Sequence, residues 1–217
     1  MAGSLFAPPN MDKTKKYPAL AVAHPFGGVK EQTAGIYARK MAEKGYVTLA
    51  FDASHQGESG GYPRDTENPA ERMEGIRCAI DYLTTLPIVD EDRVGLLGVC
   101  AGGSYVMVVA PTEMLAKAIA SVSLWDLRVT AREGVAGATV RQNQRAGGNR
   151  KATHCPILFI IGTGAATIFM SKAGYEEAAQ PKEWFEIPGA THHRLYDDEA
   201  AVGKAVAKLE EFFGRSL

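Results

Sequence analysis

The sequence predicts an α/β protein built on a doubly wound, mostly parallel sheet with helices on both faces. Apolar runs of strand length alternate along the chain with segments whose apolar residues recur at helical spacing, which is the pattern of such a sheet. No internal repeat or low-complexity tract interrupts this order. Apolar residues make up 46% and charged residues 23% of the 217 residues, a balance typical of one globular domain with a large core.

The predicted elements follow one another regularly. Strands are expected at Ala19 to Ala23, Val47 to Phe51, Val94 to Leu97, Ala118 to Ser123, Ile157 to Ile161 and Trp184 to Ile187. Helices are expected at Thr33 to Lys44, at Pro69 to Thr85, after Cys100 and at the carboxyl end of the chain. The last helix carries its apolar residues on one stripe, formed by Val202, Val206, Leu209 and Phe213.

Charge and cysteine content exclude several classes of partner. With 24 basic and 25 acidic residues the net charge is −1, so no field gathers nucleic acid or anionic lipid. The sequence shows no basic leader followed by an apolar core, and no apolar run is long enough to span a bilayer. We therefore expect a cytoplasmic protein that does not bind membranes. Cys78, Cys100 and Cys155 cannot all pair, which favours a reducing compartment. The sequence does not decide whether the protein forms a homo-oligomer.

The segment Gly98 to Gly103 predicts a nucleophile elbow. It follows an apolar strand and precedes the apolar run Tyr105 to Ala110, so a strand turns abruptly into a helix at Cys100. A helix N-terminus favours negative charge, so we expect it to lower the pKa of Cys100 and make this the most reactive thiol. The alternative is a glycine-rich turn around a small buried cysteine. A dinucleotide-binding loop would need glycine where Cys100 stands.

A second turn offers hydrogen-bond donors for the oxyanion that forms in acyl transfer. His24 to Gly28 follows the first predicted strand. Because Pro25 has no N–H, Phe26 is the first donor in this turn, and Ala101 is the second donor in the elbow. The alternative is a tight turn with a capped histidine.

A general base is expected at the end of the last strand, where His192 and His193 follow Pro188. Adjacent side chains point in different directions, so only one of the two histidines is expected to face the site. The acid that orients it is less evident, because the loop Gly162 to Ile168 contains no carboxylate. Asp126, which closes the preceding strand, either takes that role or caps the turn that follows it.

Further aspartates are predicted to have structural roles. Asp52 is expected to fasten the loop of residues 53–68 through backbone N–H groups. Asp197 and Asp198 resemble N-cap residues of the last helix.

Four motifs in order resemble the α/β-hydrolases, specifically small bacterial proteins similar to dienelactone hydrolase. They are His24 to Gln32, Phe51 to Ser59, the elbow Gly98 to Gly103, and Pro188 to His192. The resemblance covers nearly the whole chain. It implies Cys100 as nucleophile, His192 as base, and the N–H groups of Phe26 and Ala101 as the oxyanion hole.

Two departures from the family pattern stand out. The usual acid position after the penultimate strand lacks a carboxylate, which leaves a Cys-His dyad or a triad assisted by Asp126. The opening strands are short or absent, and the insertion between Leu127 and Thr153 makes a small cap on a single domain of residues 1–217.

The resemblance implies a hydrolase of small esters, thioesters or lactones, with a small-molecule acyl substrate, no organic cofactor and no metal. The histidines and carboxylates show no zinc-ligand spacing either. Three alternatives remain: an acyltransferase that uses the same cysteine, a non-catalytic relative that only binds a ligand, and redox use of Cys100.

Overall fold

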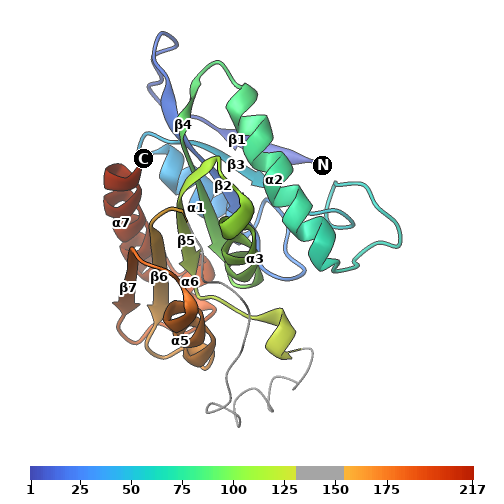
Figure 1. Ribbon diagram of the computed structural model, residues 1–217, viewed down its shortest axis with the longest axis vertical. Coiled ribbons are helices and arrows are strands. Elements are labelled where there is room, and N and C mark those ends of the chain that lie inside the picture. Colours follow the sequence, from blue (N-terminus) through green and yellow to red (C-terminus); the bar gives the residue numbers. More distant parts are fainter. Residues whose placement is uncertain (131–153) are drawn as a thin grey trace.

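The computed structural model describes residues 1–130 and 154–217, and in these residues the strands form a single sheet of seven (Figure 1). The order across the sheet is β1-β3-β2-β4-β5-β6-β7. Only β1 is antiparallel to its neighbour, so the predicted mostly parallel sheet is confirmed. The strands are β1 (Gly3–Phe6), β2 (Tyr17–Ala23), β3 (Val47–Phe51), β4 (Val89–Val99), β5 (Ala116–Val122), β6 (Ile157–Gly162) and β7 (Lys182–Ile187).

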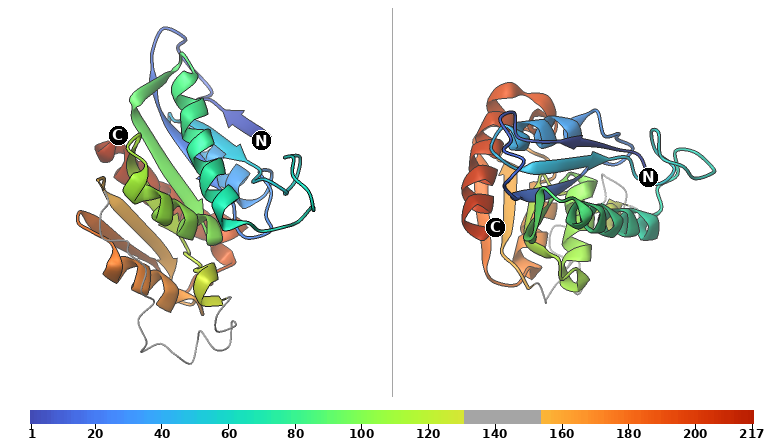
Figure 2. Two further views of the ribbon diagram at one scale, coloured as in Figure 1. Left: turned by 45° about the vertical axis from the view of Figure 1, so that its right-hand side comes forward. Right: turned by 90° about the horizontal axis from the view of Figure 1, so that it is seen from above.

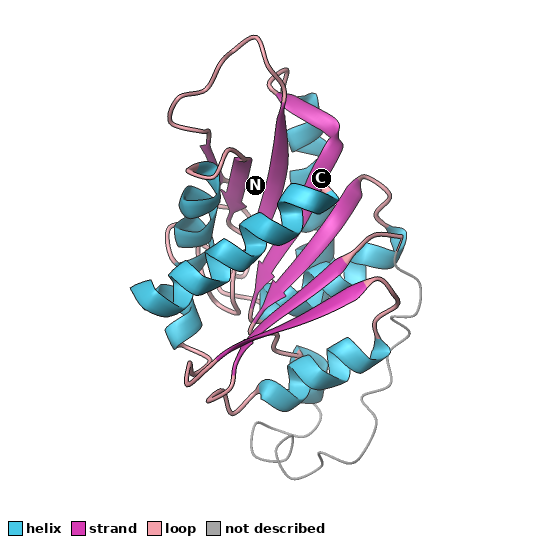
Figure 3. Cartoon of the chain, turned by 90° about the vertical axis from the view of Figure 1, so that its left-hand side faces the viewer, coloured by secondary structure: helices cyan, strands magenta, loops and turns pink. Residues whose placement is uncertain are grey.

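Helices cover both faces of the twisted sheet (Figures 2 and 3). The long helices α1 and α7 contact each other, and α2 and α3 contact each other on the opposite face. The helices are α1 (Thr33–Ala42), α2 (Pro69–Thr85), α3 (Ala101–Val109), α5 (Ile168–Glu177), α6 (Arg194–Asp197) and α7 (Glu199–Ser216), with a short 3₁₀ turn η1 (Ala110–Thr112). Within the described residues, no helix is long and apolar enough to cross a membrane.

Three elements were not predicted from the sequence. Strand β1 has four residues and lies at the edge of the sheet. Its residues are alternately exposed and half-buried, so it lacks the continuous apolar run that predicts a buried strand. Helix α5 buries only Met170, Ser171 and Gly174, too few apolar residues to give a helical stripe. Helix α6 is a single turn. Of the predicted cap, residues 127–130 form a helical turn and residues 131–153 lie outside the described residues.

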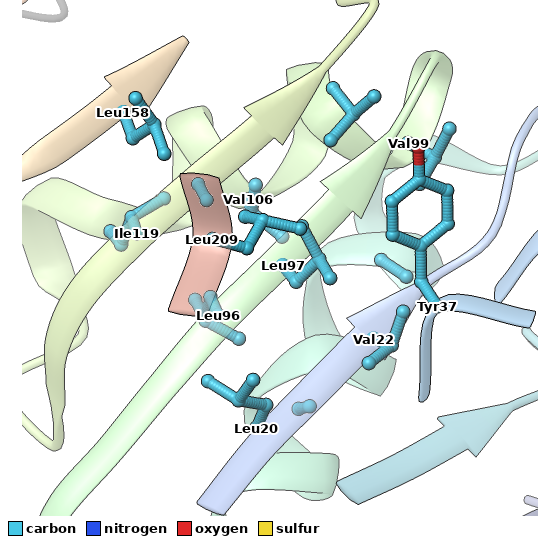
Figure 4. Packing of buried hydrophobic residues seen from close by; sticks show 14 of the residues in the cluster. Leu20, Val22, Tyr37, Leu96, Leu97, Val99, Val106, Ile119, Leu158 and Leu209 are labelled. Carbon is cyan, nitrogen blue, oxygen red and sulfur yellow. The ribbon is translucent and has the colours of Figure 1, made fainter. Parts of the chain in front are cut away.

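The core is made by strand residues on the two faces of the sheet and by helix residues that pack against them, such as Tyr37, Val106 and Leu209 (Figure 4). Leu96 and Leu97 are both fully buried, because β4 is central and helices cover it on either side. The predicted stripe of α7 is buried as well. Asp198 caps that helix by accepting a hydrogen bond from the Ala201 N–H at 2.9 Å, as expected, whereas Asp197 belongs to α6.

The register of the sheet brings the carboxyl ends of the central strands together. Ala23 pairs with Gly98, Gly98 with Ser121, and Val122 with Ile160. The residues that leave β2, β4 and β5 therefore emerge side by side at one edge of the sheet. In open α/β sheets this edge forms the ligand crevice.

The elbow fits only because its glycines allow close backbone approach. A Cβ atom on Gly102 would collide with the backbone carbonyls of Ala23 and His24, and one on Gly98 would collide with the backbone of Gly102. The start of α3 therefore lies directly on the end of β2, and the two turns occupy fixed positions relative to each other.

We predict that Gly102→Ala destabilises the protein because the carbonyls that a methyl group would meet belong to backbone. The free energy of unfolding is expected to fall by roughly 1–3 kcal/mol, with a drop in Tm of roughly 2–12 °C. Gly203→Ala is the control, since Gly203 lies in α7 with no atom near its Cβ position. Equal Tm values for Gly102→Ala and the parent protein in thermal unfolding would refute the close approach.

Candidate active site

Cys100 is the residue at which β4 ends and α3 begins. Its backbone has φ 56° and ψ −119°, a conformation that is strained for any residue except glycine. The Cys100 N–H donates to the Val122 carbonyl at 2.9 Å, and the Cys100 carbonyl accepts from the Trp125 N–H at 3.1 Å. These bonds to the end of β5 and the segment after it hold the turn in place. The predicted elbow geometry is present.

The sulfur of Cys100 lies among hydrogen-bond donors but in a buried position. Burial raises the pKa of the thiol, while the Tyr196 hydroxyl and the N–H groups of Ala101 and Phe26 lie close enough to lower it in part. Burial has the larger effect, so the pKa of the Cys100 thiol lies above its ordinary value. The expected lowering by the helix N-terminus is therefore wrong, because desolvation outweighs it.

Exposure also changes the expected order of thiol reactivity. Cys100 is only 5% exposed, whereas Cys78 is on the surface. A small alkylating reagent therefore meets Cys78 first, and reactivity at Cys100 depends on a substrate that carries its own recognition groups.

The turn that carries Phe26 is held by a buried histidine and arginine. His24 Nε2 accepts from the Ala53 N–H at 3.1 Å and from Arg72 Nη1 at 2.6 Å, and Nδ1 contacts the Pro25 carbonyl at 2.7 Å. Arg72 Nη2 also donates to the His24 carbonyl at 2.6 Å. Burial and the adjacent Arg72 charge lower the pKa of His24 to about 3, so it is neutral at physiological pH.

Asp52 fastens two loops around this turn. Its carboxylate accepts from the Glu58 N–H at 2.9 Å, which confirms the predicted role in the loop of residues 53–68. The same carboxylate accepts from the N–H of Lys30 at 2.7 Å and from the Lys30 ammonium at 2.9 Å. Burial alone would raise the pKa of Asp52, but these donors outweigh it, and the pKa lies below its ordinary value.

His192 is the buried member of the histidine pair, and His193 is exposed. The His192 Nδ1 atom contacts two hydroxyl groups, Ser123 Oγ at 2.9 Å and Thr167 Oγ1 at 2.6 Å. Burial, with a smaller contribution from the neighbouring His193, lowers the pKa of His192 to about 4. The imidazole is therefore neutral at physiological pH.

The carboxylate of Asp126 points toward a different partner. It accepts from the Arg128 N–H at 2.9 Å and from the Arg128 guanidinium at 2.9 and 3.2 Å. This is the turn-capping geometry that the sequence left as the alternative. The groups at His192 Nδ1 are the hydroxyls of Ser123 and Thr167, so the structure does not bring Asp126 to the position of a third triad member.

Tyr196 connects the thiol to the histidine. Its hydroxyl lies 3.1 Å from His192 Nε2 and is close enough to the Cys100 sulfur to influence the pKa of the thiol. Burial, with a further contribution from the nearby Cys100, raises the pKa of Tyr196, so it remains a neutral phenol. Cys100, Tyr196 and His192 thus form a continuous row of groups that can exchange protons.

Two cavities flank this row. One, of about 450 Å³, is lined by Phe26 and by residues of α2, α3 and the segment 126–130. The other, of about 300 Å³, is lined by His192 and His193 together with Trp125 and residues of α5 and the loop before it. Over the described residues, no group of three His, Cys, Asp or Glu side chains could hold a metal ion.

The sequence as a whole matches a model of the dienelactone hydrolase family over residues 1–215. The chain belongs to the dienelactone hydrolase family. Among similar proteins is the uncharacterized protein YcjY of Escherichia coli K12, 33% identical over 100% of this chain and 94% of its own length. Membership of the family supports a hydrolase on an α/β-hydrolase fold.

Solved structures agree on the fold. The crystal structure of the hypothetical protein PA2218 from Pseudomonas aeruginosa superposes with a TM-score of 0.87 at 27% identity, covering 99% of this chain and 89% of that one.

A partial sequence match of 33% identity links 55% of this chain to 39% of the acyltransferase drtE of Aspergillus calidoustus.

Sequence reasoning missed four side chains at the site of this dienelactone hydrolase family member: Arg72, Ser123, Thr167 and Tyr196. Thr167 lies in the loop Gly162 to Ile168, where the usual acid position has no carboxylate and a hydroxyl contacts the histidine instead. Tyr196 lies four residues after His192, in the single helical turn that follows it, and this short separation is a signal that could have found it.

We predict that His24 contributes to a loss of stability in acid. The pKa values of His24 and His192, about 3 and about 4 in the folded protein, lie below the ordinary value of 6.5. The unfolded chain therefore binds more protons below that value, and the free energy of unfolding falls as the pH is lowered through it. Between about pH 6 and 4.5, His24→Gln should reduce the slope by up to about 1.4 kcal/mol per pH unit, the value for one proton.

Urea unfolding at a series of pH values measures this slope, and His154→Gln, at an exposed position, is the control. An unchanged slope in His24→Gln would show that His24 takes up its proton in the folded state.

Proposed function

We propose that the protein hydrolyses small carboxylic esters, thioesters or lactones through an acyl intermediate on Cys100. The observation that carries this proposal is the convergence of the Phe26 and Ala101 N–H groups on the sulfur of a cysteine in a strained elbow. An oxygen bound to a carbon attached to that sulfur would lie near the same two donors. Preorganised donors of this kind stabilise a tetrahedral oxyanion by roughly 3–4 kcal/mol each.

In the acylation step, Cys100 Sγ attacks the substrate carbonyl carbon while its proton moves toward His192. The proton passes through Tyr196: the hydroxyl accepts the proton from sulfur and gives its own to His192 Nε2, so the phenol is unchanged at the end. The tetrahedral oxyanion is held by Phe26 and Ala101. As it collapses, the bond to the leaving group breaks and the His192 imidazolium protonates that group.

In the deacylation step, His192 takes a proton from water, and the resulting hydroxide attacks the acyl carbon. As the second oxyanion collapses, the bond between the acyl carbon and Cys100 Sγ breaks and the carboxylic acid is released. The His192 imidazolium returns its proton through Tyr196 to the sulfur, which re-forms the Cys100 thiol. An acceptor other than water would make the same intermediate an acyltransferase, and the partial match to a protein named acyltransferase favours testing this second candidate.

Ser123 and Thr167 support His192 differently from a carboxylate. A hydroxyl accepts the Nδ1 proton and fixes the tautomer that leaves Nε2 free to accept a proton. It carries no charge to stabilise the imidazolium. The histidine is therefore a weak base, and this suits a thiol better than an alcohol, because a thiol gives up its proton more readily.

We predict that an activated acyl donor modifies Cys100 and not the other cysteines. In a Cys78→Ser background, p-nitrophenyl acetate should give an intact mass increased by one acetyl group, which peptide mapping places on Cys100. Cys100→Ala in the same background should show neither this adduct nor turnover above the uncatalysed rate. Acetylation at Cys155 alone would contradict the proposal, and acetate transferred to an added thiol or amine in preference to water would identify an acyltransferase.

We predict that Tyr196→Phe slows acylation because the proton path from sulfur to His192 is interrupted. Loss of assisted proton transfer is typically worth roughly 100- to 10,000-fold in rate, and we expect the burst of p-nitrophenol to slow within that range. Tyr62→Phe, at a position 89% exposed, is the matched control. If Tyr196→Phe acylates at the rate of the parent protein, the hydroxyl only fills space and the proton reaches His192 by another route.

A further inference from the structure

The larger cavity beside the elbow contains polar groups that the proposed chemistry does not use. Tyr105, on α3, is 6% exposed, and Glu67, before α2, has a side chain 11% exposed. Both residues line the cavity of about 450 Å³. In the described part of the chain, the Tyr105 hydroxyl and the Glu67 carboxylate lie close enough to interact with each other, but neither makes a well-aligned hydrogen bond. Buried polar atoms without well-aligned partners are costly, so a ligand that completes their hydrogen bonds is favoured in this cavity.

The same groups lie next to the reacting atoms. Arg72, which supports the turn of Phe26, has Glu67, Tyr105 and Cys100 as charged or polar neighbours. Its guanidinium lies 5.1 Å from the centre of the Tyr105 ring, and its Nε lies 3.3 Å from a Glu67 oxygen without the alignment of a hydrogen bond. Phe26, an expected oxyanion donor, lines the cavity too.

The direction of the acyl group follows from the position of His192. In the proposed function, His192 protonates the leaving group, which must therefore lie on the side of the smaller cavity that His192 lines. The carbonyl oxygen lies between Phe26 and Ala101. The acyl chain is the remaining substituent of the carbonyl carbon, and the larger cavity is the space that remains for it. Its other walls are mostly apolar, with Pro69, Met73, Val108 and Leu127 among them.

We propose that the larger cavity selects acyl groups that carry a hydroxyl, which bonds to Glu67 and Tyr105. A hydroxyl matches this pair, since it can donate to the carboxylate and accept from the phenol at the same time. An ammonium group cannot accept from Tyr105, and Arg72 already offsets the charge of Glu67. A plain acyl chain would leave the two groups with only each other and Arg72 as partners. This inference rests on the proposed acyl-transfer function.

The test compares matched substrates that differ only in the hydroxyl. We would measure kcat/KM for the hexanoyl, β-hydroxyhexanoyl and ω-hydroxyhexanoyl thioesters of N-acetylcysteamine, and for the phenylpropanoyl and p-hydroxyphenylpropanoyl thioesters. At least one hydroxylated substrate should exceed its plain counterpart by about 10- to 100-fold, the range expected for hydrogen bonds to a charged and a neutral group. Tyr105→Phe and Glu67→Gln should each reduce that ratio to within about threefold of unity.

Two control variants remove the same chemical groups from the surface. Tyr82→Phe and Glu74→Gln change side chains that are exposed on α2, and both should keep the preference of the parent protein. If Glu67→Gln fails to fold, as judged by circular dichroism, Tyr105→Phe decides the question alone. A parent protein without preference for any hydroxylated thioester, or a preference that survives in Tyr105→Phe, overturns the inference.

A binding measurement separates this inference from the proposed function. Cys100→Ala is titrated with the carboxamides of the same acyl groups, and tighter binding of a hydroxylated amide that disappears with Tyr105→Phe supports the cavity assignment even if no thioester is consumed. Equal binding of plain and hydroxylated amides counts against the cavity assignment, whereas the absence of turnover in the parent protein counts against the proposed function.

Discussion

The close contact between the start of α3 and the end of β2 is the constraint on which the rest of the site depends. Gly102 lies against the backbone carbonyls of Ala23 and His24, and no other residue type fits there. This single contact places the elbow of Cys100 beside the turn of Phe26. The two N–H groups that converge on the sulfur belong to different turns, and their separation is set by backbone packing rather than by any side chain.

The surrounding polar network serves that backbone arrangement. His24 and Arg72 hold the Phe26 turn from one side, and Asp52 with Lys30 holds it from the other. All four groups are buried, and the side chains of His24, Arg72 and Asp52 bond to main-chain atoms. Loss of one bond would leave a polar atom unpaired and would also let the Phe26 N–H move. Fold stability and site geometry are therefore properties of the same few contacts.

The parts of the molecule that the sequence predicted are those governed by local patterns. The central strands, the glycine elbow and the turn after β2 have short signatures of apolar runs, Gly and Pro, and the structure contains them. The surroundings of His192 were not predictable in this way, because Ser123 and Thr167 meet its ring from 69 and 25 residues away. Asp126 illustrates the same limit, since its position after a strand was evident while the direction of its carboxylate depended on Arg128.

If Cys100 and His192 exchange a proton as proposed, the acidity of a thiol favours a cysteine at the elbow. With the pKa of His192 near 4 and that of a thiol at about 8.5 or higher, proton transfer from sulfur to imidazole costs at least roughly 6 kcal/mol. For an alcohol, about as weakly acidic as water at a pKa near 15.7, the same transfer would cost about 16 kcal/mol. A typical turnover of about 10 per second corresponds to a total barrier of about 16 kcal/mol, so an alcohol would consume all of it in one proton transfer. In the proposed function, a histidine supported only by hydroxyls therefore favours the thiol of Cys100 over an alcohol as the nucleophile.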